Sequence, residues 1–110
     1  MNNDSYFLVP TDIIYRGWWK DTAAVCVFFF LLADALLKDR EMHNGLVVKR
    51  GQWLGWVEEI ANKTGLPAKG VAAALKKLER FDEIRCERAG VWWLITVKDF
   101  ELYQEAGEDG

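Results

Sequence analysis

The stretch Ile60–Ile84, IANKTGLPAKGVAAALKKLERFDEI, has the spacing of a helix-turn-helix. Ala61 is small enough for a second helix to cross close over it, and Gly65 can take the left-handed conformation that ends a helix. Four apolar residues then fall on one face of the next helix, namely Leu66, Val71, Leu75 and Leu78. The pattern predicts helices over residues 56–64 and 67–81, the second of which would enter the major groove of DNA. The alternative is an ordinary helical hairpin.

A β-hairpin is predicted directly after this stretch. Residues 84–88 alternate apolar and charged side chains, Ala89-Gly90 can turn, and residues 91–97 are strongly β-prone. A hairpin that follows a recognition helix makes a β-wing. A last short helix is expected over residues 99–104, and residues 105–110 are expected to be an acidic, disordered tail.

The first half of the chain predicts one long helix and two short extended pieces. The helix covers roughly Thr22–Leu37 and is apolar nearly all round. A polar segment, 38–45, contains the turn Asn44-Gly45 and precedes extended pieces at 46–48 and 52–54. The predicted fold class is therefore α+β, mainly helical: a winged helix-turn-helix with a C-terminal β-hairpin wing.

The composition is that of one folded domain, which we place at residues 1–104. Hydrophobic residues make up 51% of the chain, enough for a single core. The apolar run at 23–33 is shorter than the roughly 20 residues that span a bilayer, so no membrane contact is expected. Cys26 and Cys86 have no metal-binding spacing, and His43 stands alone. We expect a cytoplasmic protein that is not an enzyme and holds no metal or cofactor.

The helix-turn-helix region is the basic part of an acidic chain. The whole chain has a net charge of −3, whereas residues 49–88 hold nine Lys/Arg and six Asp/Glu and so carry +3. If Val71, Leu75 and Leu78 face inward, the opposite face of the helix carries a cationic stripe. The candidate DNA-binding residues on that stripe, beside it and around it are Lys63, Lys69, Ala73, Lys76, Lys77, Arg80, Arg85 and Arg88. The alternative is ordinary surface charge, and four acids nearby would repel phosphate: Glu58, Glu59, Glu83 and Glu87.

Several stretches together resemble one family. They are Tyr6-Phe7, Trp18 to Asp21, Lys49-Arg50-Gly51-Gln52, Val71 to Glu79, and Ile95-Thr96-Val97 followed by Phe100 and Tyr103-Gln104. This combination resembles the N-terminal winged-helix domain of phage and prophage replication proteins, which is similar to the DnaD family of Gram-positive bacteria. The resemblance implies binding of double-stranded DNA in replication initiation or helicase loading, and a replication-protein partner.

The chain departs from that family where DNA would be read. Gly55-Trp56 and Pro67-Ala68 stand where the family has hydroxyl residues that cap a helix and can bond phosphate. Gly70, Ala72 and Ala73 replace longer polar residues on the second helix, and they cannot hydrogen-bond a base edge. Weak binding with little sequence preference is therefore expected. The rival interpretation is a protein-interaction module that has lost its DNA contacts.

The apolar long helix also predicts self-association. A monomer would leave part of the apolar surface of this helix exposed to water. We therefore expect a homodimer through Trp18, Trp19, Phe30 and Leu37. The alternative is that the hairpin and the last short helix wrap this helix within one chain. The tryptophan pairs at 18–19, 53/56 and 92–93 are interpreted as packing or interface residues, with stacking of single-stranded bases as the alternative.

Overall fold

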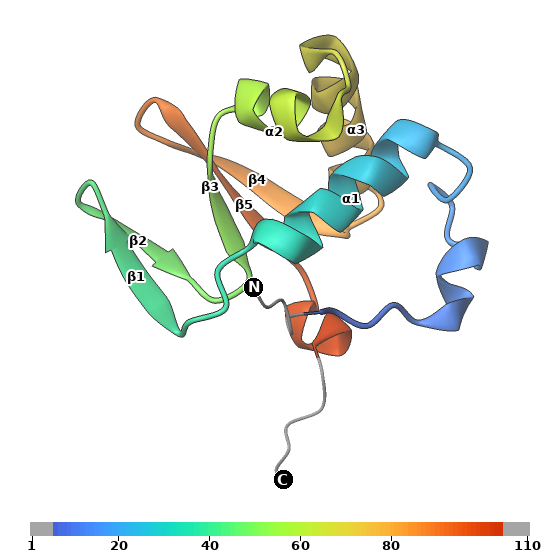
Figure 1. Cartoon of the computed structure of the whole chain (residues 1–110), viewed down its shortest axis with the longest axis horizontal. Coiled ribbons are helices and arrows are strands. Elements are labelled where there is room, and N and C mark those ends of the chain that lie inside the picture. The colour runs from blue at the N-terminus through green and yellow to red at the C-terminus, as the bar shows by residue number, and fades with distance from the viewer. Residues whose placement is uncertain (1–5, 105–110) are drawn as a thin grey trace, which may run out of the picture.

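The computed structural model describes residues 6–104 and has an α+β fold with three α-helices and two small antiparallel sheets (Figure 1). In chain order the elements are the 3-10 helix η1 (Thr11–Tyr15), α1 (Thr22–Asp34), β1 (Arg40–His43), β2 (Leu46–Lys49), β3 (Gln52–Gly55), α2 (Val57–Thr64), α3 (Ala68–Arg80), β4 (Ile84–Ala89), β5 (Trp92–Val97) and the 3-10 helix η2 (Phe100–Tyr103). The acidic tail predicted at 105–110 lies outside the described residues. None of the described helices is long and apolar enough to cross a membrane.

The two helices predicted around Gly65 are α2 and α3, and the prediction is confirmed to within a residue at each end. Gly65 ends α2 in the left-handed conformation, with φ of 79°. The apolar face of α3 is buried as predicted, at Val71, Leu75 and Leu78. Pro67 differs from expectation only in that it precedes α3 as its N-cap residue.

The predicted hairpin is also present and forms most of the larger sheet. The strand order is β3-β5-β4, with both pairings antiparallel, so β5 is central. Ile84, Ile95 and Val97 point toward the helices and are buried, as is Trp53 on β3. One face of this sheet therefore closes the hydrophobic core.

The helix α1 lies at the centre of that core. It packs against both α2 and α3, and Ala24, Val27, Phe28, Leu31 and Leu32 are buried. The Phe28 ring lies 5.0 Å from the Trp18 ring and 5.4 Å from the Tyr103 ring, measured between centroids. Most of α1 is thus covered within one chain, by α2, α3, Trp18 and Tyr103 of η2.

The predicted end of this helix was three residues too late. The helix ends at Asp34, and Ala35 is already extended. The Leu36 amide then donates to the Gln52 carbonyl, and the Gly51 amide donates to the Leu36 carbonyl. Pairing with a segment beside β3 replaces the last helical turn, which the helical spacing of residues 22–37 could not reveal.

The polar segment 38–45, in which only the turn Asn44-Gly45 was predicted, also contains the strand β1. Strand β1 pairs with β2 as an antiparallel hairpin, turning at Asn44-Gly45, which have φ of 51° and 81°. Two consecutive positive φ values suit the tight turn that Asn-Gly favours. All four residues of β1 are exposed, so no burial pattern marks this strand in the sequence. In Figure 1 this hairpin stands apart from α2 and α3.

The segment Arg50-Gly51-Gln52 holds three parts of the fold together. Arg50 pairs with Glu101 at 2.5 Å and donates to the Leu37 carbonyl. The Gln52 side chain donates to Thr96 Oγ1 on β5 at 2.9 Å. These partners all lie within the chain, so the segment has a structural role here.

Trp18 was predicted to lie in a subunit interface, and this is wrong because the residue is buried within its own chain. Its side chain is 1% exposed, and its indole N–H donates to Glu83 Oε2 at 2.9 Å. Arg16 also pairs with Glu83, at 3.0 Å, and donates to the Tyr103 hydroxyl at 2.8 Å. The partner that buries Trp18 lies far along the sequence, so the pair Trp18-Trp19 gave no sign of it.

Candidate nucleic-acid interface

The outer face of α3 carries the predicted cationic stripe. Lys69, Ala73, Lys76 and Arg80 are all exposed, on the side of the helix away from buried Val71 and Leu78. Within residues 6–104, no ion pair occupies Lys69, Lys76 or Arg80. Lys63, near the end of α2, is exposed and equally unpaired. These cations are available to an anionic ligand.

The remaining candidates are partly engaged inside the molecule. The Lys77 ammonium lies 2.9 Å from Asp21 Oδ2, which draws it toward the start of α1. Arg85 lies 3.6 Å from the Glu87 carboxylate on the same strand. The Arg88 guanidinium stands over the Trp93 ring at 4.6 Å. The candidate residues therefore fall into two sets. The cations on the outer face of α3 and at the end of α2 have no ion pair within the described part of the chain, whereas Lys77, Arg85 and Arg88 contact other side chains of the chain.

Several acids near the stripe accept hydrogen bonds within the chain. Glu83 holds the Arg16–Trp18 network, so Arg16 neutralises its charge. Glu79 Oε2 accepts the Cys86 amide at 3.0 Å and so joins α3 to β4. Glu58 and Glu59 occupy the first turn of α2 and are exposed. Of the four acids expected to repel phosphate, Glu83 is paired with Arg16 and Glu87 lies 3.6 Å from Arg85, so the repulsion rests mainly on Glu58 and Glu59.

The missing hydroxyl cap of α2 has a local replacement. Glu59 Oε1 accepts the Trp56 amide at 2.7 Å, which satisfies the N-cap backbone from within the first turn. Gly55 leaves room for this arrangement, because a Cβ there would collide with both the Glu59 carboxylate and the Trp53 ring. No comparable replacement exists at α3, where Pro67 provides no side-chain hydrogen bond.

A groove lies between α3 and the β4–β5 hairpin, beside the stripe. It has a volume of about 270 Å³ and is lined by Val57, Ala72, Leu75, Lys76, Glu79, Cys86 and Trp93. Burial, with a smaller contribution from Glu79, raises the pKa of the Cys86 thiol to about 12. The thiol is therefore neutral at pH 7, and Lys76 and Glu79 carry the only charges among the lining residues. No pattern in the sequence indicated this groove, because four separate elements form it, namely α2, α3, β4 and β5.

The tryptophan pair on β5 divides between the two faces of the sheet. Trp93 is opposite Gly55 and Arg88 and faces the helices, whereas Trp92 is on the other face, with its ring 5.7 Å from His43. Both are half-buried. Trp53 is buried and donates from its indole N–H to Asp34 at 2.9 Å. Among these three, Trp93 alone lines the groove beside α3.

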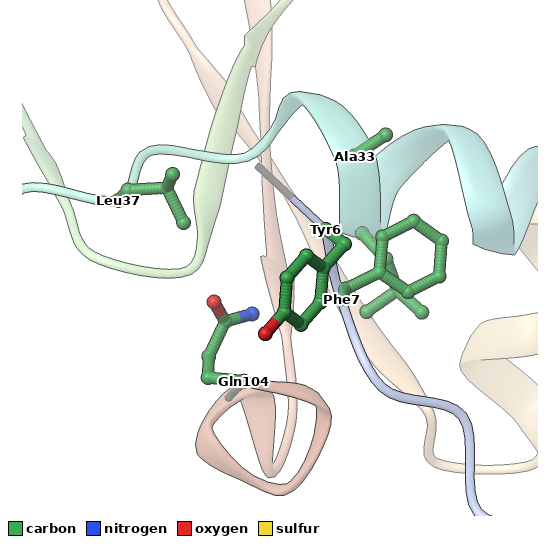
Figure 2. Close-up of a pocket in the computed structure, with 6 residues that line it drawn as sticks. Tyr6, Phe7, Ala33, Leu37 and Gln104 are labelled. Atoms are coloured by element: carbon green, nitrogen blue, oxygen red, sulfur yellow. The ribbon is translucent and has the colours of Figure 1, made fainter. Parts of the chain in front are cut away.

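A second hollow, of about 370 Å³, lies at the C-terminal end of α1 (Figure 2). Its lining residues are Tyr6, Phe7, Leu32, Ala33, Leu37 and Gln104. Leu37 is 51% exposed. Trp19 and Phe30 are half-buried and pack against the core, and Phe30 lies 5.8 Å from the Trp53 ring. Of the four predicted interface residues, only Leu37 is strongly exposed.

Among residues 6–104, no group of three or more His, Cys, Asp or Glu side chains could hold a metal ion. Comparison of the chain with protein-family models, with curated proteins and with solved structures finds no match. The described residues form an α+β domain in which α3, with its unpaired cations, lies beside an apolar groove.

Proposed function

We propose that this chain is a winged-helix module that binds double-stranded DNA without enzymatic activity, with α3 as the recognition helix. Apart from the β1–β2 hairpin that follows α1, the elements run α1, β3, α2, α3, β4, β5, as expected of a winged helix. The β4–β5 hairpin follows α3, where a wing would stand. The resemblance to phage replication proteins further suggests a role in replication initiation or helicase loading. The cytoplasm is the compartment that this role requires.

One observation carries the proposal: the outer face of α3 presents three cations with no acidic partner. Lys69, Lys76 and Arg80 are exposed along one side of the helix, and Ala73 between them leaves that side unobstructed. Each such cation can release one condensed counterion on meeting a phosphate. With Lys63 included, about four contacts would give a slope of log affinity against log salt of about −3 to −4.

The side chains on α3 favour phosphate over base contacts. Ala72 and Ala73 have no hydrogen-bonding group, and Gly70 has no side chain at all. Binding supported by cations alone is weak, falls steeply with salt and shows little sequence preference. This expectation separates the proposal from a sequence-specific repressor.

The test is binding to random-sequence duplex DNA at two salt concentrations. Replacing Lys69, Lys76 and Arg80 together by Ala should abolish binding at the lower salt concentration. A control triple variant, with Lys20, Lys38 and Lys49 changed to Ala, removes the same charge from exposed positions elsewhere. If the α3 variant binds as tightly as the control, α3 is not the DNA contact.

The rival function is a dimerisation or scaffold module, and the hollow at the end of α1 favours it. Leu37 and Tyr6 on its lining are 51% and 59% exposed. Exposed apolar side chains that gather around a hollow are typical of protein contacts. This surface involves different residues from α3, so the two functions can be tested separately.

A further inference from the structure

The groove between α3 and the β4–β5 hairpin combines an apolar lining with an adjacent row of unpaired cations. Val57, Leu75 and Cys86 form its apolar interior together with Ala72 and Trp93. On α3, Lys76 follows Ala72 by four residues, which places it only about 40° further round the helix. Lys76 therefore belongs to both the groove and the cationic stripe.

Small size at one position keeps this groove open. Ala72 lies on the exposed side of α3 and lines the groove, whereas the neighbouring Leu75 is buried. A larger side chain at 72 would extend into the groove, which Trp93 also lines. Ala72 cannot hydrogen-bond a base edge, but its small side chain leaves room in the groove for a planar group.

Trp93 gives the groove an aromatic wall. Trp93 also lines a separate hollow, which is not the one at the end of α1, together with Trp56 and Val91. Its side chain is therefore accessible from more than one side. The Arg88 guanidinium lies 4.6 Å from the Trp93 ring centre, which adds a cation at this wall. Aromatic rings and arginine beside a cationic track are the features that hold unpaired bases in single-stranded nucleic acid.

We propose that this groove receives an unpaired base of single-stranded DNA, while the phosphates of that strand lie along Lys69, Lys76 and Arg80. The inference rests on the proposed function, because the same stripe holds the backbone in both. A paired base could reach the groove only by leaving its stack and its pairing partner, which weakens binding. The protein should therefore prefer single-stranded DNA to a duplex of the same length, and the wall should discriminate little among bases.

The experiment compares two strands that differ only in their bases. A thymidine oligonucleotide of about 12 nucleotides, within the range of single-strand binding sites, is measured beside an oligonucleotide of equal length built from abasic sites. The parent chain should bind the thymidine strand at least fivefold more tightly. Ala72→Leu, which fills the groove, should remove this difference while the weaker binding to the abasic strand remains.

Two control variants isolate the groove. Ala68→Leu makes the same substitution at an exposed position of α3 that does not line it, and should keep the fivefold preference. Trp93→Ala should lose the preference, whereas Trp92→Ala, on the opposite face of the same strand, should keep it. Thermal unfolding of each variant identifies any that is not folded, and Ala72→Leu tests the groove without removing a core side chain.

The outcomes distinguish this inference from the proposed function. Equal binding of the thymidine and abasic strands by the parent would overturn the inference, even if duplex binding remains sensitive to the stripe. An undiminished preference in Ala72→Leu would also overturn it and would leave the groove free for an apolar side chain of a protein partner. Absence of binding to any DNA at low salt would contradict the proposed function itself.

Discussion

At the scale of single residues, positions that look like ligand contacts in the sequence serve the fold. Arg50, Gly51 and Gln52 carry part of the family resemblance, yet each bonds to another part of the chain. Glu83, expected to repel DNA, is bonded to Arg16 and Trp18. Lys69, Lys76 and Arg80 differ from these residues because no internal partner occupies them.

Gly51 is predicted to be a more sensitive position than Gly65, although both have a left-handed backbone. Their φ values are 83° and 79°, so alanine is strained at either, by roughly 1 kcal/mol. A Cβ at Gly51 would also lie 2.9 Å from Phe100 Cβ, whereas nothing lies within 4 Å at Gly65. Gly51→Ala should lower the free energy of unfolding by about 1–3 kcal/mol more than Gly65→Ala does, measured by urea denaturation. Equal losses of unfolding free energy in the two variants would show that the Phe100 side chain moves aside without cost, and would contradict this prediction.

At the scale of elements, α1 depends on a cap that also carries charge. Asp21 accepts the Ala24 amide at 3.1 Å and pairs with Lys77 on α3. These partners, Lys77 first, lower the pKa of Asp21 below its ordinary value of 3.8. The Asp21 side chain thus caps the N-terminus of α1 and forms an ion pair with α3.

Removing this cap should destabilise the protein in a pH-dependent way. Asp21→Ala is predicted to lower the free energy of unfolding by about 1 kcal/mol at pH 7. Because the folded-state pKa is depressed, the charge-dependent part is present above about pH 4 and is lost as the pH falls through the folded-state value. Asp21→Asn keeps the cap and should lose only that part. Urea denaturation from pH 3 to pH 7 measures both, and a pH-independent difference between parent and Asp21→Asn would contradict this account.

Local patterns predicted the elements that depend on local residues. The spacing around Gly65 was sufficient to place α2 and α3. Alternation in residues 84–88, the turn at Ala89-Gly90 and the β-prone residues 91–97 were sufficient for the hairpin. The end of α1 was missed because distant hydrogen bonds to Gln52 and Gly51 set it. Strand β1 was missed because its side chains are all exposed and leave no apolar period.

The site was predictable to a similar extent and for the same reason. The outer stripe of α3 follows from the helical period of its apolar residues, so Lys69, Lys76 and Arg80 could be named in advance. The partners of Lys77 and Arg88 lie on other elements, and no periodicity reveals them. The groove required Ala72, Cys86 and Trp93 to be placed together in space.

At the scale of the whole molecule, the fold covers most of the surface that suggested a dimer. Trp18 is buried, and Phe30 packs against Trp53, which leaves Leu37 and Tyr6 as exposed apolar residues at the end of α1. The predicted dimer would therefore have to form through the small surface around Leu37 and Tyr6, and not along the whole of α1.

Sedimentation at micromolar concentration tests the remaining possibility of self-association. A homodimer through the end of α1 would sediment at about twice the chain mass of 12.7 kDa, and Leu37→Glu should convert it to the monomer. Met42→Glu, an exposed apolar residue on the separate hairpin, is the matched control and should leave the mass unchanged. A single species near 12.7 kDa for the parent would rule the dimer out.

The most direct test of the central claim, that DNA binds along α3, is a map of the contact surface. Amide chemical shifts of the isotopically labelled protein should be followed during titration with random-sequence duplex DNA at low salt. The account predicts that the shifts which move fall on α3, around Lys69, Lys76 and Arg80, with smaller changes at Lys63 and on the β4–β5 hairpin, and that added salt reverses them. Changes confined to the end of α1 or to the β1–β2 hairpin, or no changes at all, would contradict it.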